Sequence, residues 1–176
     1  MNYSVEVATP GDIREAIEID NDACLLYEEA GLVFDLTDDH PFAVSERGRW
    51  ERDASLDRLF FARDESGARV GFAALDRFDG AAYLDQLSVR RSAMRRGAGR
   101  FLLRHALAWA RANRDPFLWL TTYAHLPWNR PFYESEGFTV VPEAEHGPGV
   151  RRDLDDQRRF LPAPEERVAM RAPLAP

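Results

Sequence analysis

The sequence predicts a mixed α/β fold, in which helices flank one sheet that is antiparallel at first and parallel at its centre. Three strand-like segments between Phe60 and Val89 follow one another through short turns, as in an antiparallel meander. A turn with two glycines, an amphipathic helix and a further strand-like segment come next. This strand–helix–strand order predicts a parallel pair of strands, joined by a crossover, beside the meander.

The composition is that of a folded protein without nucleic-acid or membrane partners. A chain of 176 residues with 45% hydrophobic residues can bury one core, so we expect a single domain over residues 1–176. The net charge of -7 is unfavourable for binding to nucleic-acid phosphates. The single cysteine, Cys24, cannot form an internal disulfide, the N-terminal residues lack the pattern of a secretory signal, and no apolar run approaches the roughly 20 residues that span a bilayer. We therefore expect a cytoplasmic protein.

The N-terminal third is predicted to contain a strand and two helices. Residues Tyr3 to Ala8 alternate as in a short strand, and Asp12 to Glu15 has the pattern of a capping box for a helix that stops near Gly31. Residues 32–42 are acidic and aromatic without a clear period, and a second helical stretch covers residues 45–56.

The rest of the chain supplies the sheet. Strand-like runs at residues 59–63, 69–75 and 81–89 are separated by turn signals, and a helix begins near Gly97. The later elements that we expect are a strand at 117–123, a short helix at 129–136, a strand at 138–141, a helix at about 150–160 and a last strand at about 167–171.

The turn after the third strand is suited to an anion. Gly97 and Gly99 lie where a helix begins, so free backbone N–H groups and the helix dipole can meet a pyrophosphate there. Arg95, Arg96 and Arg100 add positive charge to the same turn, which would let an acidic protein hold an anionic ligand locally. Two glycines at a helix start are also common in structural turns, so this feature alone does not identify a ligand.

Two other phosphate-binding motifs do not fit this turn. A dinucleotide-binding fingerprint needs three spaced glycines after an early parallel strand, and a Walker motif needs Gly-Lys-Ser or Gly-Lys-Thr. Neither pattern is present. We therefore do not expect a nicotinamide or nucleoside triphosphate ligand.

Two segments resemble the GNAT acetyltransferases. LSVRRSAMRRGAGRFLL is similar to the phosphate-binding motif of that family, with residues 95–99 matching its core, although Met94 replaces the usual Gln or Arg. WNRPFYESEGF is similar to the family's helix with an Asn, an aromatic–Tyr pair and a Gly-Phe strand start. The resemblance covers about Phe60 to Val141. It implies a GNAT acyltransferase-like fold, whose parallel central strands splay apart, and acetyl-CoA as the co-substrate.

The resemblance also implies which residues bind the cofactor. The backbone of Leu87 and Val89 would bind the pantetheine arm, Asn129 would contact the same arm, and the pyrophosphate would be held by Arg95, Arg96, Gly97, Ala98, Gly99 and Arg100. Asn129 also stands where an ordinary helix N-cap would stand. Acetyl is expected because it is the commonest acyl group in the family.

Direct transfer from a thioester to an amine benefits from a proton donor for the leaving thiolate. The resemblance gives this role to Tyr133, which lies one helical turn after Asn129. The alternative is that Tyr133 only packs beside Phe132.

The amine must lose a proton, and Asp85 is our candidate for the base. In the alternating strand YLDQLSV, Asp85 would share a face with Tyr83, Leu87 and Val89, and an acid in mid-strand is disfavoured unless a polar group faces it. The alternative is a solvated or ion-paired Asp85. His125 is a second candidate, because the pKa of an unperturbed imidazole is near neutrality.

The acceptor is predicted only as an amine. Phe34, Asp35 and His125 are candidate substrate-binding residues, and the acidic run at 35–40 favours a cationic acceptor unless it is simply a solvated surface. No His, Cys and Asp spacing suits a metal, so we expect none. The function predicted is N-acetylation, with a non-catalytic acyl-CoA-binding regulatory module as the alternative, and a homodimer is left open.

Overall fold

The computed structural model describes residues 2–174, whose contacts form two compact units. Within these residues, unit 1 comprises 2–76 and Asp85–Ala106, and unit 2 comprises Arg77–Leu84 and 107–174. The strands at 69–78 and 81–89 therefore contribute residues to both units. No helix of the described part is both long and apolar enough to cross a membrane.

Unit 1 contains the N-terminal antiparallel strands and three helices. Its elements are β1 (Ser4–Val7), α1 (Ile13–Glu29), α2 (Pro41–Ser55), β2 (Leu59–Arg63), most of β3 (Arg69–Phe78), the end of β4 (Ala81–Val89) and the start of α3 (Ala98–Ala112). β1 pairs antiparallel with β2, and β2 pairs antiparallel with β3. The neighbours β2, β3 and β4 follow the order of the predicted meander, and β1 lies beside β2.

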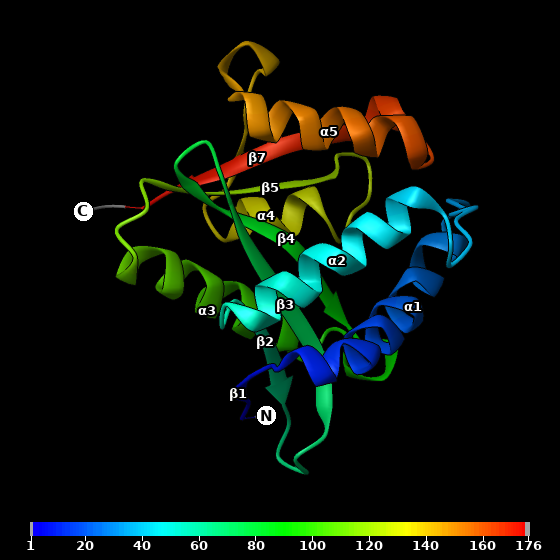
Figure 1. Ribbon diagram of the computed structural model, residues 1–176, viewed down its shortest axis with the longest axis vertical. Helices are drawn as coiled ribbons and strands as arrows, with labels where there is room; N and C mark the ends of the chain where they lie inside the picture. Colours follow the sequence, from blue (N-terminus) through cyan, green and yellow to red (C-terminus); the bar gives the residue numbers. More distant parts are fainter. Residues whose placement is uncertain (1, 175–176) are drawn as a thin grey trace. The chain divides into compact units, whose positions relative to one another are not determined.

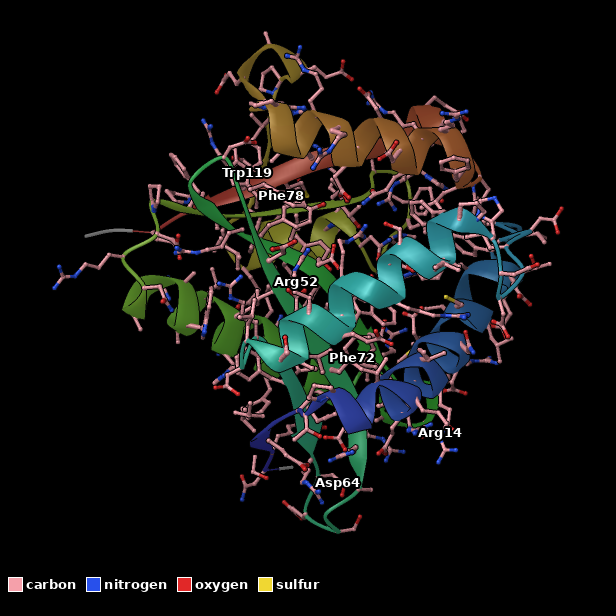
Figure 2. The ribbon with its side chains drawn as sticks, in the orientation of Figure 1. Arg14, Arg52, Asp64, Phe72, Phe78 and Trp119 are labelled. Atoms are coloured by element: carbon pink, nitrogen blue, oxygen red, sulfur yellow. The ribbon has the colours of Figure 1, made fainter. Side chains whose placement is uncertain are left out.

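Helices cover both faces of these strands in unit 1. On one face, α1 and α2 lie over the strands (Figure 1) and share a core with Phe61 and with Phe72, which Figure 2 labels. The ring of Trp50 on α2 meets Phe72 edge-on, with ring centres 5.1 Å apart. On the other face, Phe60 contacts His105 of α3, with ring centres 4.6 Å apart. The alternation of Phe60 and Phe61 therefore sends one ring to each helical layer.

Unit 2 contains the parallel pair and the C-terminal elements. These are the start of β4, the end of α3, β5 (Phe117–Tyr123), α4 (Arg130–Ser135), β6 (Thr139–Val140), α5 (Pro148–Phe160) and β7 (Arg167–Pro173). β4 and β5 are parallel, with Ala82 opposite Leu118, and β7 is antiparallel to both β5 and β6. In Figure 1, α5 runs along β7. Residues of α5 share a core with Trp119, and Phe78 packs against this core; Figure 2 labels both aromatic residues.

The mixed α/β class is confirmed. The strand order is β1-β2-β3-β4-β5-β7-β6, with the parallel pair at β4 and β5. The predicted bounds of β2, β4 and β5 are those observed, whereas β3 continues to Phe78.

The capping contacts before α1 and the start of α2 differ from the sequence-based expectation, whereas α1 begins directly after Asp12 as predicted. The carboxylate of Asp12 accepts hydrogen bonds from Thr9 N and Thr9 Oγ1 at 2.8 and 2.7 Å, so the capping box is Thr9 to Asp12 and not Asp12 to Glu15. α2 begins at Pro41, four residues earlier than predicted, because proline suits the first turn of a helix and His40 Nδ1 accepts from Phe42 N at 3.1 Å.

Candidate functional site

The loop that joins β4 to α3 has the backbone geometry of an anion-binding turn. Arg95 and Gly97 have φ angles of +59° and +93°, and Arg96 between them does not share this positive range. Consecutive residues that alternate in this way form a concavity toward which successive N–H groups point. The first helical bond of α3 runs from Phe101 N to Gly97 O at 2.9 Å, so the N–H groups of Ala98, Gly99 and Arg100 precede it.

Two arginines of this loop keep their charge available. Arg95 and Arg96 are exposed, and neither guanidinium has a hydrogen bond or ion pair with any residue in the range 2–174. The neighbouring Arg91, by contrast, pairs with Glu29. Arg100 is also exposed, in the first turn of α3. Unit 1 therefore combines the N–H concavity and the unpaired guanidinium groups of Arg95 and Arg96 in one loop.

The end of β4 is tied to α1 through Asp20. Its Oδ1 accepts hydrogen bonds from Gln86 Nε2 and Ser88 Oγ, both at 2.6 Å. Burial raises the pKa of Asp20, although these bonds and one from Cys24 oppose the rise. Leu87 lies between the two bonded residues and Val89 follows them, so α1 positions the strand segment whose backbone is the predicted pantetheine site.

Asp85 is a buried, ion-paired carboxylate. Its side chain is 1% exposed, and Arg49 Nε on α2 lies 3.0 and 3.3 Å from its two oxygens. The ion pair considered as the alternative for Asp85 is therefore present. Its role as the base stays a prediction.

The predicted common face of Tyr83, Asp85, Leu87 and Val89 is wrong. Asp85 contacts α2, and the adjacent Gln86 contacts α1 in the same helical layer. Val89 instead approaches Gly71 on the α3 side, where a Cβ added to Gly71 would lie 3.1 Å from Val89 Cγ2 and 3.2 Å from Leu102. Strict alternation cannot send two adjacent side chains to one layer, so the alternation of β4 is broken between Asp85 and Gln86.

Sequence reasoning missed a second acid beside Asp85. Asp53 on α2 is fully buried, and neither of its oxygens has a hydrogen-bond partner in the described structure. Burial, and then the charges of Asp85 and Asp76, raise its pKa to about 8. The nearest cation is Arg52, labelled in Figure 2, whose Nη2 lies 3.5 Å from Asp53 Oδ1 and which also pairs with Asp76.

A sequence signal for Asp53 did exist. It stands three and four residues from Trp50 and Arg49 and next to Ala54, so it belongs to the stretch of α2 that faces the strands. An acid on the apolar side of an amphipathic helix is unusual, because burial disfavours its charge. The apolar pattern of the helix could therefore have identified Asp53 as an unusual buried acid.

The first two candidate substrate residues lie in the connection between α1 and α2. Phe34 is half-buried and meets Tyr27 of α1 edge-on, with ring centres 5.6 Å apart. Asp35 is exposed. Asp38 and Asp39 of the same run accept bonds from Arg47 and Thr37, so part of the predicted acidic surface is satisfied locally.

Unit 2 carries the other candidates. Asn129 is buried at the N-cap position of α4, but its side chain makes no capping bond, and Tyr133 N donates to its carbonyl oxygen at 3.1 Å. Tyr133 is half-buried, with its ring 5.1 Å from Phe132 and 5.7 Å from Phe138. The packing contact proposed as the alternative for Tyr133 is thus present, and its role as the acid stays a prediction.

His125 follows β5 and has a carboxylate partner. Its Nδ1 lies 3.4 Å from Glu166 Oε2, and its ring meets Tyr123 edge-on at 5.7 Å. Both groups of the pair are about one-third exposed. His125 is therefore accessible but bound within unit 2.

Comparison with solved structures identifies the fold. N-acetylglutamate synthase from Neisseria gonorrhoeae, complexed with coenzyme A and N-acetyl-glutamate, matches with a TM-score of 0.70 at 19% identity, over 100% of this chain and 36% of the synthase. A GNAT family acetyltransferase from Staphylococcus aureus Mu50 matches with a TM-score of 0.72 at 15% identity, over 99% of this chain and 100% of that one. The PaiA N-acetyltransferase from Thermoplasma acidophilum, in complex with coenzyme A, matches with a TM-score of 0.68 at 14% identity, over 98% and 99%.

The chain thus spans little more than a third of the synthase but the whole length of the other two proteins. At these identities the similarity concerns the fold. The family itself is identified by sequence, since the family model of the acetyltransferase (GNAT) family matches residues 17–138, which include the loop before α3 as well as Asn129 and Tyr133. With this match over more than half of its length, the chain belongs to the acetyltransferase (GNAT) family.

Proposed function

We propose that this protein is an acetyl-CoA-dependent N-acetyltransferase, which transfers acetyl directly to an amine acceptor in a ternary complex. The observation that carries the proposal is the loop before α3, with its converging N–H groups and with the guanidinium groups of Arg95 and Arg96, which have no partner among residues 2–174. Membership of the family supports acetyl transfer, and the coenzyme A complexes of two similar proteins support the carrier.

The residues present suit a pyrophosphate. In the proposal, the N–H groups of residues 97–100 bind its oxygens, with Arg95, Arg96 and Arg100 supplying charge in a protein whose net charge is -7. The backbone of Leu87 and Val89 binds the pantetheine arm, and Asn129 contacts the same arm. Acetyl-CoA supplies the activated acyl group.

Two proton transfers complete the proposed mechanism. The amine must lose a proton to become a nucleophile, and Asp85 accepts it directly or through water. When Asp85 accepts the proton, its carboxylate becomes neutral and no longer forms an ion pair with Arg49. Tyr133 donates its phenolic proton to the departing sulfur and recovers a proton from solvent.

The proposed acceptor is a cationic amine. Asp35 offers an exposed carboxylate and Phe34 an apolar ring in the α1–α2 connection, and His125 with Glu166 offers a second polar pair. We also propose that both units belong to a single domain, because the family match runs through segments of both.

The proposal is tested with Tyr133→Phe and a panel of amines, by measuring release of coenzyme A. We expect the variant to lose about a hundredfold or more in kcat, because a positioned acid contributes on this scale. The matched control is Tyr123→Phe, which removes another phenol that binds Pro162 O in unit 2 and should keep its turnover. A Tyr133→Phe protein as active as the parent would exclude the acid role.

The second candidate is a non-catalytic acyl-CoA-binding module, which family membership alone does not separate from an enzyme. If the protein is such a module, acetyl-CoA should raise its melting temperature, but no amine of the panel should cause release of coenzyme A. Absence of any thermal shift would contradict both candidates.

A further inference from the structure

Tyr3, just before β1, contacts the loop that precedes α3. Its hydroxyl donates a hydrogen bond of 3.0 Å to the carbonyl oxygen of Arg96, which is 93 positions away. Its ring also lies 5.6 Å from that of Phe101 in the first turns of α3. One side chain near the N-terminus thus touches both the loop and the helix that it opens.

The bond to Arg96 determines the direction of the next N–H group. None of the described peptide bonds is cis, and the C=O and N–H of a planar trans peptide point in opposite directions. A carbonyl of Arg96 that is held toward Tyr3 therefore turns the N–H of Gly97 away from Tyr3. That N–H belongs to the series that forms the concavity of the loop.

The loop needs such support, because its backbone is not in a relaxed conformation. Arg95 has a φ of +59°, a region that residues other than glycine rarely occupy unless the surrounding structure holds them there. Gly97 has a φ of +93°. The Arg96–Gly97 peptide lies between these two positions, and it is the peptide that Tyr3 binds.

Tyr3 is itself fixed by its neighbours in the chain. Asn2 N donates to Glu65 Oε1 at 2.9 Å, and Ser4 pairs with Arg63 in the β1–β2 ladder. Both partners belong to the region of the β2–β3 hairpin, whose tip Figure 2 marks with Asp64. Tyr3 therefore lies between two residues that are both held by the hairpin region.

We propose that Tyr3 is a positioning residue for coenzyme A, whose hydroxyl orients the Arg96–Gly97 peptide so that the Gly97 N–H faces the pyrophosphate. The inference rests on the proposed function, because it takes the loop to be the pyrophosphate site. Tyr3 does not touch the ligand in this scheme; it acts through the backbone of the loop.

The test is the dissociation constant of coenzyme A, measured by calorimetry for the parent and for Tyr3→Phe. This change keeps the ring against Phe101 and removes only the hydroxyl. We expect affinity to fall about five- to tenfold, the ratio that one lost hydrogen bond gives. The melting temperature without ligand should stay within a few degrees of the parent's, since the bond is exposed.

Two comparisons separate positioning from general stability. Tyr123→Phe removes a phenol bound to a backbone carbonyl at 2.8 Å and should leave the dissociation constant unchanged even if its melting temperature falls. On a Gly97→Ala background, the Tyr3→Phe change should cost less affinity than on the parent, because both act on one peptide.

The outcomes distinguish this inference from the proposed function. A parent protein that does not bind coenzyme A contradicts both. A parent that binds coenzyme A, together with a Tyr3→Phe variant within twofold of it, overturns the role of Tyr3 alone. Equal losses from Tyr3→Phe and Tyr123→Phe would also overturn it, since the effect would then follow stability.

Discussion

The carboxyl group of Asp53 on α2 is fully buried without a hydrogen-bond donor among the described residues, and two other acids lie near it. Its pKa is raised from the usual 3.8 to about 8. The unfolded chain therefore releases this proton at a lower pH than the folded chain. Between about pH 4 and pH 8 the folded state holds one more proton, so the free energy of unfolding decreases as the pH rises.

Asp53→Asn should abolish this dependence. The amide resembles the protonated acid and carries no charge, so we expect the variant to exceed the parent in unfolding free energy by roughly 2 to 5 kcal/mol at pH 8. Near pH 4 the two proteins should be alike. Urea unfolding curves at pH 4.5, 6 and 8 measure the difference, and a gain that is equal at all three pH values would contradict the assigned pKa.

Some residues of the site can be predicted from the sequence and others cannot, for a physical reason. The loop at residues 95–100 is local, because its glycines, charges and helix start are contiguous in the sequence. The bond of Tyr3 to Arg96, and the charges of Asp76 and Asp85 near Asp53, come from segments that meet only in the folded chain. Asp85 stands out in the sequence as an anomaly in its strand, but its partner Arg49 lies 36 positions earlier.

Among the elements, α5 illustrates how a turn can cap a distant helix. Asp79 has a φ of +53° in the turn between β3 and β4, and its carboxylate accepts from Gly149 N at 2.9 Å and from Val150 N at 3.0 Å. These N–H groups belong to the first turn of α5, which has no cap from its own N-cap residue Gly147. The cap thus comes from 70 positions upstream.

Asp79→Ala should destabilise the protein by about 1 to 2 kcal/mol, because it removes the cap and places alanine at a positive φ. Asp79→Asn keeps an acceptor oxygen and tolerates this backbone conformation, so it should lose less than half as much. Chemical denaturation of both variants makes the comparison. Equal losses would indicate that the negative charge, and not the cap geometry, is what matters.

Elements are predicted well where one periodicity continues, and less well at their ends. β2, β4 and β5 have the predicted bounds because their apolar runs are bordered by turn residues. The predicted start of α2 is wrong because the acidic segment before it shows no helical period. The hydrogen bond by which His40 caps the helix cannot be read from the spacing of apolar residues. The break in β4 is likewise invisible to a rule that assumes strict alternation.

At the scale of the whole molecule, stability should depend on pH in two opposite ways. Hydrogen bonds from Arg69 and Arg63 lower the pKa of Glu6 to about 2, and bonds from Thr9 and then Arg69 lower that of Asp12 to about 2. The usual pKa values of these acids are 4.5 and 3.8. Glu6 and Asp12 stabilise the folded state fully above their usual pKa values, and this contribution is lost as the pH falls toward 2. Asp53 has the opposite effect, because it destabilises the folded state increasingly above about pH 4.

Arg69→Gln should make the folded protein less stable at acid pH. Arg69 binds Glu6, Asp12 and Glu15, so one substitution removes the cation that all three share. We expect the midpoint of acid unfolding to move up by about one pH unit. Arg14→Gln is the control, because Arg14 is an exposed arginine whose pair with Glu18 is 4.0 Å long, and its midpoint should not move. A midpoint unchanged by Arg69→Gln would remove this network from the explanation of acid stability.

The broken alternation of β4 has a consequence for how relatives of this chain are aligned. From Gln86 on, the strand faces opposite to what counting from Asp85 would assign, because Gln86 and Ser88 contact α1 and Val89 approaches Gly71. A relative shorter by one residue at this point would have a regular strand, and its counterparts of Ser88 and Val89 would keep their faces. An alignment that leaves out this one-residue gap would therefore equate residues that face opposite helical layers.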